Sequence, residues 1–292
     1  MIGWFQRRKS VRTQVAEAAD VPPFAGLPPD LRLHAIGDIH GCDALLARQH
    51  VSIDEMQRNR PKARVVEIVL GDMIDRGPES RGVISRLIAR SERHSVVVLR
   101  GNHEAMMLRF LADPLTLKDW IRVGGLETLK SYGVTPVLPL EPDSMVRTAR
   151  EAVDAIPAAH IAFLQGLVPA WTCGGFTFVH AGLRPGVPLA EQAERDLTEI
   201  REPFLSHAGS FGTFVVHGHT PVRAIDVKAN RINIDTGAFA TGNLSSIAIE
   251  SGGIFSLTTS LPSEIPQGGA PPTTGAPHEP SAQDSRYTAQ AS

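Results

Sequence analysis

Short apolar and β-branched runs recur along the chain, and five of them end at a cluster of Gly, Asp, Asn or His. A short run of this kind that stops at turn-forming residues is typical of a buried strand that enters a loop. The five runs cover residues 33–36, 65–70, 96–99, 176–179 and 214–216. The pattern therefore predicts buried strands whose carboxyl ends carry polar loops.

Apolar residues between the early strands recur at helical spacing instead. Residues 43–58 and 81–93 each carry several apolar side chains at mostly helical spacing, which predicts two helices. A third helix is expected over residues 189–205, and further strands over 231–234, 244–250 and 253–257. A β-α-β-α-β opening followed by several strands favours an α/β fold in which helices cover a mixed sheet system. Functional loops in such sheets collect at the carboxyl ends of strands.

Composition separates one folded domain from two tails. Residues 262–292 are rich in Pro, Gly, Ser, Thr and Ala, and such a segment cannot bury enough apolar surface to offset its ordering entropy. We therefore expect a disordered tail. Residues 1–30 contain two Pro-Pro pairs and are expected to form a flexible lead-in. The folded domain is predicted to span residues 31–261.

Charge and cysteine content exclude several classes of protein. The chain has 29 basic and 31 acidic residues, so it lacks the basic excess that nucleic-acid binding usually requires. Two cysteines, Cys42 and Cys173, are too few for a disulfide framework and favour a reducing, cytoplasmic setting. No stretch approaches the roughly 18 to 20 apolar residues of a membrane span. Residues 1–12 mix aromatic and basic side chains, which leaves a membrane-surface anchor as an alternative to a frayed terminus.

The polar clusters after the first two strands contain paired metal-type ligands. Asp38 and His40 lie on a glycine-flanked turn, so both can point at one ion. Taken alone, this pattern fits turn and helix-cap residues equally well. Asp72 follows the second strand as Asp38 follows the first, and two buried carboxylates that close repel each other unless cations lie between them. The pair therefore indicates a metal site.

Three further clusters enlarge the ligand set. Asn102 offers a neutral carbonyl oxygen to a hard ion, and His103 beside it is free for proton transfer. Histidines follow the last two strands as well. Carboxylates, an amide and imidazoles without a thiolate suit divalent manganese, iron or zinc and exclude an iron-sulfur cluster. Because the set exceeds what one catalytic zinc needs, it favours two ions about 3.5 to 4 Å apart.

The five ordered motifs resemble those of the calcineurin-like metallophosphoesterases, more narrowly the bacterial and phage branch of the phosphoprotein phosphatase (serine/threonine phosphatase) family. They read GDIHG, GDMIDRG, GNHE, HAG and GHTP, and they cover Gly37 to Pro221. Trp120, the Gly124-Gly125 pair and Ser131-Tyr132-Gly133 also resemble a helical insert of bacterial members. The resemblance implies a four-layer α/β/β/α fold, with a central β-sandwich flanked by helices.

The same resemblance implies a role for each motif residue. His103 would donate a proton to the leaving oxygen and would be oriented by Asp75, while Arg76 and Arg201 would bind phosphate oxygens. Relatives often have a tryptophan two residues before the second arginine, where this chain has Glu199. The implied metal ligands are Asp38 and His40 for the first ion, Asp72 for both ions, and Asn102, His180 and His219 for the second ion, with His217 as a neighbour of that site.

The activity implied is hydrolysis of phosphate monoesters by direct attack of a hydroxide shared by two divalent ions, most simply manganese. A serine/threonine-type phosphatase acting on a phosphoprotein is the first hypothesis, and Glu104 and the Asp75-Arg76-Gly77 string favour it. The alternative is a hydrolase of dinucleoside polyphosphates, a small phosphorylated substrate. A phosphate-binding module without catalysis is a third reading, which the intact Asp75 and His103 disfavour. The sequence predicts no oligomeric state.

Overall fold

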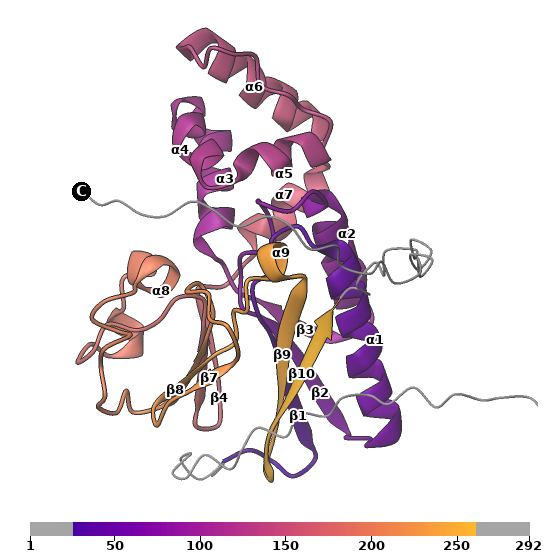
Figure 1. The fold of residues 1–292 in the computed structure, drawn as a ribbon, viewed down its shortest axis with the longest axis vertical. Helices are drawn as coiled ribbons and strands as arrows, with labels where there is room; N and C mark the ends of the chain where they lie inside the picture. Colours follow the sequence, from indigo (N-terminus) through magenta and orange to yellow (C-terminus); the bar gives the residue numbers. More distant parts are fainter. Residues whose placement is uncertain (1–25, 261–292) are drawn as a thin grey trace, which may run out of the picture. The chain divides into compact units, whose positions relative to one another are not determined.

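Two five-stranded sheets form the centre of the part of the chain that the computed structural model describes, residues 26–260 (Figure 1). The first has the order β10-β9-β1-β2-β3 and the second the order β4-β5-β6-β8-β7. The strands of the first sheet are β1 (Leu31–Ile36), β2 (Arg64–Val69), β3 (Ser95–Val98), β9 (Asn243–Glu250) and β10 (Gly253–Ser260). Those of the second are β4 (Ala170–Cys173), β5 (Phe176–Val179), β6 (Phe214–His217), β7 (Asp226–Val227) and β8 (Arg231–Asn233). The expected tail at 262–292 and nearly all of the lead-in lie outside the described residues.

Successive side chains of a strand point to opposite faces of its sheet, and this alternation explains how the two sheets pack face to face. In β1, Leu33 and Ala35 point into an apolar layer that Phe178 and Val216 fill from the second sheet. Ile36 points the other way, into the layer formed with the helices. The two sheets thus form the predicted β-sandwich, with one apolar core between them and another on the outer face of the first sheet.

Helices α1 (Asp43–Asn59) and α2 (Ser80–Ser91) cover that outer face (Figure 1). They are the crossovers between β1, β2 and β3, which pair in parallel and therefore need such connections. Leu46 and Ile53 of α1 and Val83 and Leu87 of α2 are fully buried. These are the faces that the apolar spacing predicts.

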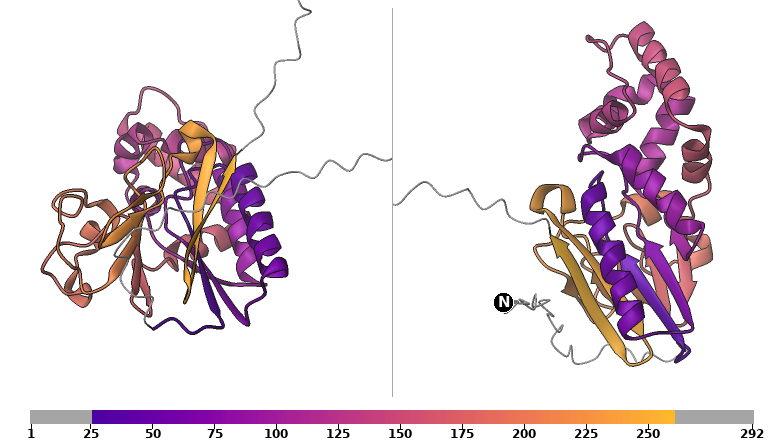
Figure 2. Two further views of the ribbon diagram at one scale, coloured as in Figure 1. Left: turned by 60° about the horizontal axis from the view of Figure 1, so that its bottom comes forward. Right: turned by 90° about the vertical axis from the view of Figure 1, so that its right-hand side faces the viewer.

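A second group of helices follows β3 and lies beyond the ends of the strands (Figure 2). It corresponds to the helical insert that the resemblance implies. Its members are α3 (Asn102–Ala112), the short 3-10 helix η1 (Pro114–Thr116), α4 (Leu117–Arg122), α5 (Gly125–Ser131), α6 (Pro142–Ala155) and α7 (Ala158–Gln165).

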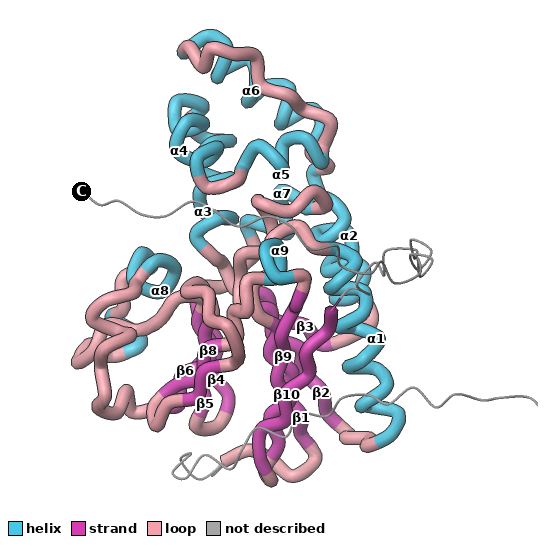
Figure 3. Tube along the Cα trace, viewed as in Figure 1, coloured by secondary structure: helices cyan, strands magenta, loops and turns pink. Residues whose placement is uncertain are grey.

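The helix expected over residues 189–205 is wrong in extent. The structure has a 3-10 turn, η2 (Leu189–Glu191), and a six-residue helix, α8 (Glu194–Glu199), followed by loop (Figure 3). The Gln192 side chain donates to the Arg184 and Val187 carbonyls and accepts from the Arg184 amide, which holds the chain extended before α8. Pro203 disfavours helical geometry in the residue before it. The fourth layer is therefore one short helix and a loop, which cover the outer face of the second sheet through a small apolar cluster.

Six parallel strands, three in each sheet, carry the loops that matter for function. In the first sheet β1, β2 and β3 are parallel, and in the second β5, β6 and β8 are parallel. Every predicted motif follows the carboxyl end of one of these strands. None of the helices within residues 26–260 has the length and apolar character needed to cross a lipid bilayer.

Candidate metal centre

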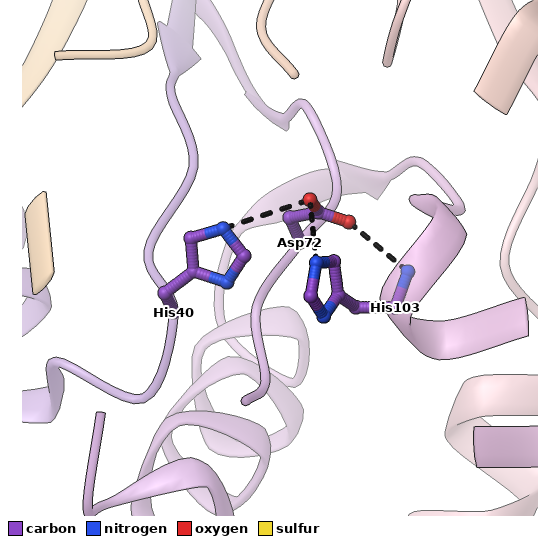
Figure 4. Close-up of side chains that lie close together, drawn as sticks. All are labelled: His40, Asp72 and His103. Atoms are coloured by element: carbon purple, nitrogen blue, oxygen red, sulfur yellow. Dashed lines mark hydrogen bonds and ion pairs between the residues drawn. The ribbon is translucent and has the colours of Figure 1, made fainter. Parts of the chain in front are cut away.

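Asp72 lies at the centre of a cluster of metal-ligand-type side chains, all buried except the half-buried His219. It belongs to two groups, one with His40 and His103 and the other with His180 and His219. Within each group the ligand atoms lie within 4.8 Å of one another. Figure 4 shows the first group, with both imidazoles turned toward the Asp72 carboxylate. The two groups share only Asp72, which is the arrangement of a carboxylate between two ions.

Backbone carbonyls orient two of these histidines. His40 Nδ1 lies 2.9 Å from the Ile74 carbonyl oxygen, and His180 Nδ1 lies 2.8 Å from the Leu70 carbonyl oxygen. Each Nδ1–H donates to its carbonyl, and each Nε2 is turned toward the Asp72 carboxylate, at 3.6 Å for His40 and 3.3 Å for His180. Histidine ligands of metals are oriented in this way in proteins. His180 Nε2 also lies 3.2 Å from Asn102 Oδ1, which places the predicted amide ligand beside the second group.

Asp38 presents a carboxylate oxygen without a protein partner. Its Oδ2 accepts the His219 amide at 3.0 Å, whereas its Oδ1 is buried and has no hydrogen-bond partner among the described residues. A Cβ on Gly218 would collide with that same oxygen, so the loop after β6 approaches as closely as only glycine allows. A buried carboxylate oxygen without a donor is costly unless a cation binds it.

Like charges crowd the centre. Burial, followed by the charge of Asp235, raises the pKa of Asp38 well above its ordinary value. Burial alone would also raise the pKa of Asp72, but His180 and His103 outweigh it and hold the pKa well below the usual range. Buried carboxylates of this density call for cations. The orphan oxygen, the oriented imidazoles and the thiolate-free donor set together fit a pair of divalent ions.

Asp75 and His103 form a second unit beside the ligands. His103 Nδ1 lies 2.7 Å from Asp75 Oδ2, which leaves Nε2 facing the centre, 3.2 Å from a nitrogen of the Arg76 guanidinium. Burial lowers the pKa of His103, but the Asp72 charge and the Asp75 hydrogen bond outweigh it, so the net shift is upward. In this structure the Arg76 N–H donates to Nε2, so Nε2 is free to carry and donate a proton once Arg76 turns to another acceptor, such as a phosphate.

The helical insert holds the Asp75 carboxylate. Trp120 Nε1 of α4 donates to Asp75 Oδ2 at 2.8 Å, and Thr128 Oγ1 of α5 donates to Oδ1. Phe110 stacks on the Trp120 ring, and all three side chains are buried. The insert thus fixes the group that orients His103.

Replacing Trp120 by phenylalanine removes the N–H donor and keeps an aromatic ring, although a smaller one, and so tests this contact. We expect Trp120→Phe to lower turnover of an alkyl phosphate about tenfold, because a misoriented His103 donates its proton less effectively. A substrate with a good leaving group, p-nitrophenyl phosphate, needs less proton donation and should lose less. Steady-state kinetics on both substrates, with metal content as control, measures the difference. Equal losses on both would assign Trp120 to general packing.

Backbone strain is concentrated in the same place. All five non-glycine residues of positive φ among residues 26–260 belong to the predicted motifs. Such residues cost on the order of 1–3 kcal/mol each and persist only where the surroundings impose them, typically at functional sites. They are His40, Asp72, Asp75, Arg76 and His219, with φ between 46° and 71°.

Glu104 supports the loop after β2 and does not face the ligands. Its carboxylate accepts the backbone amides of Asp72, Met73 and Gly101 at 2.7 to 3.0 Å. Burial, followed by the Asp72 charge, raises the pKa of Glu104 to about 7. The glutamate that favours a protein phosphatase in the sequence is therefore a scaffold for Asp72.

Arg201 is exposed, whereas His217 is fully buried. Burial, followed by the charge of His180, lowers the pKa of His219 to about 3, and the charge of Arg201 acts in the same direction. His217 is fully buried, packs edge-on against Phe204, and its Nε2 has no partner among the described residues. The structure places His219, and not His217, in a ligand group.

Asp235 is a residue of this centre that the sequence analysis does not identify. It is buried after β8 and contributes to the electrostatics of Asp38, and its Oδ1 accepts the Gly237 amide at 2.8 Å. Its signal in the sequence is the one used for the other motifs, an Asp after an apolar strand and before a glycine. A single Asp without a neighbouring histidine is a weaker form of that signal.

Comparisons with known proteins agree with this geometry. A bis(5'-nucleosyl)-tetraphosphatase PrpE [asymmetrical] of Geobacillus sp. (strain WCH70) is 27% identical over 80% of this chain and 96% of its own. A serine/threonine-protein phosphatase 1 of Salmonella typhimurium is 30% identical over 74% of this chain and 90% of its own. A crystal structure assigned provisionally as a diadenosine tetraphosphatase has the same fold, with a TM-score of 0.54 and 23% identity over 78% of this chain and 93% of its own. The model of the calcineurin-like phosphoesterase family matches residues 31–239. The chain belongs to the calcineurin-like phosphoesterase family.

Proposed function

We propose that the protein hydrolyses dinucleoside tetraphosphates asymmetrically, with two divalent ions held by Asp38, His40, Asp72, Asn102, His180 and His219. The observation that carries a two-ion hydrolase is the pair of ligand groups that share Asp72, beside an oriented histidine. The substrate class rests on relatives, several of which are named bis(5'-nucleosyl)-tetraphosphatases and align over about four fifths of this chain. A dinucleoside polyphosphate is the substrate that the sequence alone ranks second, after a phosphoprotein.

The chemistry divides between the ions and the side chains. When bound, the ions supply Lewis acidity toward the phosphoryl oxygens and make water a nucleophile near neutral pH. Arg76 and Arg201 bind the remaining phosphate charge through charge-assisted hydrogen bonds. His103, oriented by Asp75, gives its Nε2 proton to the oxygen that leaves as the P–O bond breaks. Manganese suits the mixed oxygen and imidazole donors, with iron and zinc as alternatives.

The products identify the reaction. Asymmetrical cleavage of diadenosine tetraphosphate divides four phosphates into one and three, so we expect AMP and ATP in equal amounts. Chromatography of the products from manganese-loaded protein measures this directly. Two molecules of ADP would indicate symmetrical cleavage, and no nucleotide product would reject the proposed substrate class.

A phosphoprotein phosphatase is the second candidate, and the Salmonella relative favours it. It would use the same centre, so the test is a comparison of kcat/KM. We expect kcat/KM for diadenosine tetraphosphate to exceed kcat/KM for a phosphoserine peptide. A higher value for the peptide would restore the protein phosphatase as the first choice.

A further inference from the structure

One exposed aromatic side chain lies beside the metal centre. Phe239 is 43% exposed, and the other large exposed apolar side chains within residues 26–260 are aliphatic. Single exposed apolar residues are ordinary on protein surfaces, so the position of Phe239 has to carry the argument. Its ring meets the His40 ring edge-on, with centroids 5.4 Å apart, and the Arg76 guanidinium carbon lies over it at 5.0 Å from the centroid. Phe239 therefore touches both a metal ligand and a phosphate-binding arginine.

The ring is held by a hydrogen-bonded turn. Phe239 belongs to α9 (Ala238–Thr241), which lies between two glycines of positive φ, Gly237 and Gly242. Thr241 Oγ1 donates to the Thr236 carbonyl at 2.9 Å, and Asp235 accepts the Gly237 amide. The loop that presents Phe239 is thus anchored at the metal centre itself. A ring fixed in this way loses little conformational entropy when a ligand packs on it.

The neighbouring arginine determines what could pack there. A phosphate bound by Arg76 brings its ester substituent close to Phe239, since the guanidinium already lies on the ring. Nucleobases stack on aromatic side chains with little base preference, because every base has a π face. Each stacked base contributes ~1–3 kcal/mol, or about 5- to 150-fold in affinity. A nucleoside phosphate matches both groups at once.

We propose that Phe239 is the stacking platform for a nucleobase of the substrate, next to the phosphate held by Arg76. This inference rests on the proposed function, because it makes the substrate a nucleoside phosphate. Stacking on Phe239 requires no particular pattern of hydrogen-bond donors and acceptors on the base. We therefore expect bases other than adenine to be accepted as well.

The test compares two ligands that differ only by the base. Isothermal titration calorimetry of manganese-loaded protein gives Kd for AMP and for ribose 5-phosphate. We expect AMP to bind at least about tenfold more tightly than ribose 5-phosphate. Phe239→Ala and Phe239→Leu should reduce this ratio toward one, whereas Phe239→Trp should preserve it. Leu115→Ala, a truncation at an exposed apolar residue of η1, is the matched control and should keep the wild-type ratio.

The outcomes separate this inference from the proposed function. A wild-type ratio near one, or an unchanged ratio in Phe239→Ala, overturns the stacking platform even if AMP and ATP are formed from diadenosine tetraphosphate. A ratio that collapses in Phe239→Ala supports the platform even if the dinucleotide is not cleaved. If Phe239→Ala instead lowers kcat/KM for a phosphoserine peptide and leaves the ligand ratio intact, the ring recognises peptide and the inference is wrong. Circular dichroism of each variant checks the fold.

Discussion

Replacing Asp72 by asparagine is expected to lower metal-dependent turnover by about four orders of magnitude or more, because both ligand groups lose their shared charged member. Asparagine has nearly the same size and shape as aspartate, so the substitution leaves no cavity in the buried site. Metal analysis should show fewer than two manganese ions per chain. Thermal unfolding adds a readout independent of activity, since an ion at about 100 times its Kd stabilises the folded state by about 2.7 kcal/mol.

His40→Asn is the matched comparison, because it removes a ligand from only one group. We expect it to weaken one ion and to keep part of the manganese-induced rise in Tm. Asp72→Asn should abolish most of that rise. If Asp72→Asn kept two ions with wild-type affinity, the bridging role would be wrong.

Replacing His103 by asparagine is expected to lower turnover by about 10² to 10⁴-fold while both ions remain bound. The reason is that Asp75 holds His103 Nδ1 and Nε2 faces the centre, which suits the role of proton donor proposed for His103. The loss should be largest for an alkyl phosphate, whose leaving oxygen is strongly basic, and smaller for diadenosine tetraphosphate. Kinetics on both substrates and metal analysis measure this.

His103 also lies in a ligand group with His40 and Asp72. The same variant therefore distinguishes a metal ligand from a proton donor. Loss of an ion together with turnover in His103→Asn would make His103 a ligand and not the proton donor. Unchanged turnover would remove it from the mechanism altogether.

The motif residues could be predicted because local sequence determines their placement. Each follows an apolar strand, and parallel strands in one sheet bring their carboxyl ends to one edge. The loops after β1, β2 and β3 therefore had to lie near one another. That the loops after β5 and β6 meet them depends on the sandwich, for which the sequence offers the resemblance alone.

The features that could not be predicted from the sequence depend on contacts between residues far apart in the chain. Trp120 reaches Asp75 across 45 positions, and nothing near Trp120 indicates that partner. Phe239 is one apolar residue in a short turn, which carries no periodic signal. The overlong helix at 189–205 fails for a similar reason, because the side chain of Gln192 bonds to a loop that the spacing of apolar residues cannot reveal.

Asp72 would be shared by two divalent ions, held by loops that follow five parallel strands of the two sheets. Anomalous diffraction from crystals of the manganese-loaded protein tests it most directly. We predict two manganese peaks, one beside His40 and one beside His180 and His219, both in contact with Asp72. A single peak, or peaks that do not touch Asp72, would contradict the account.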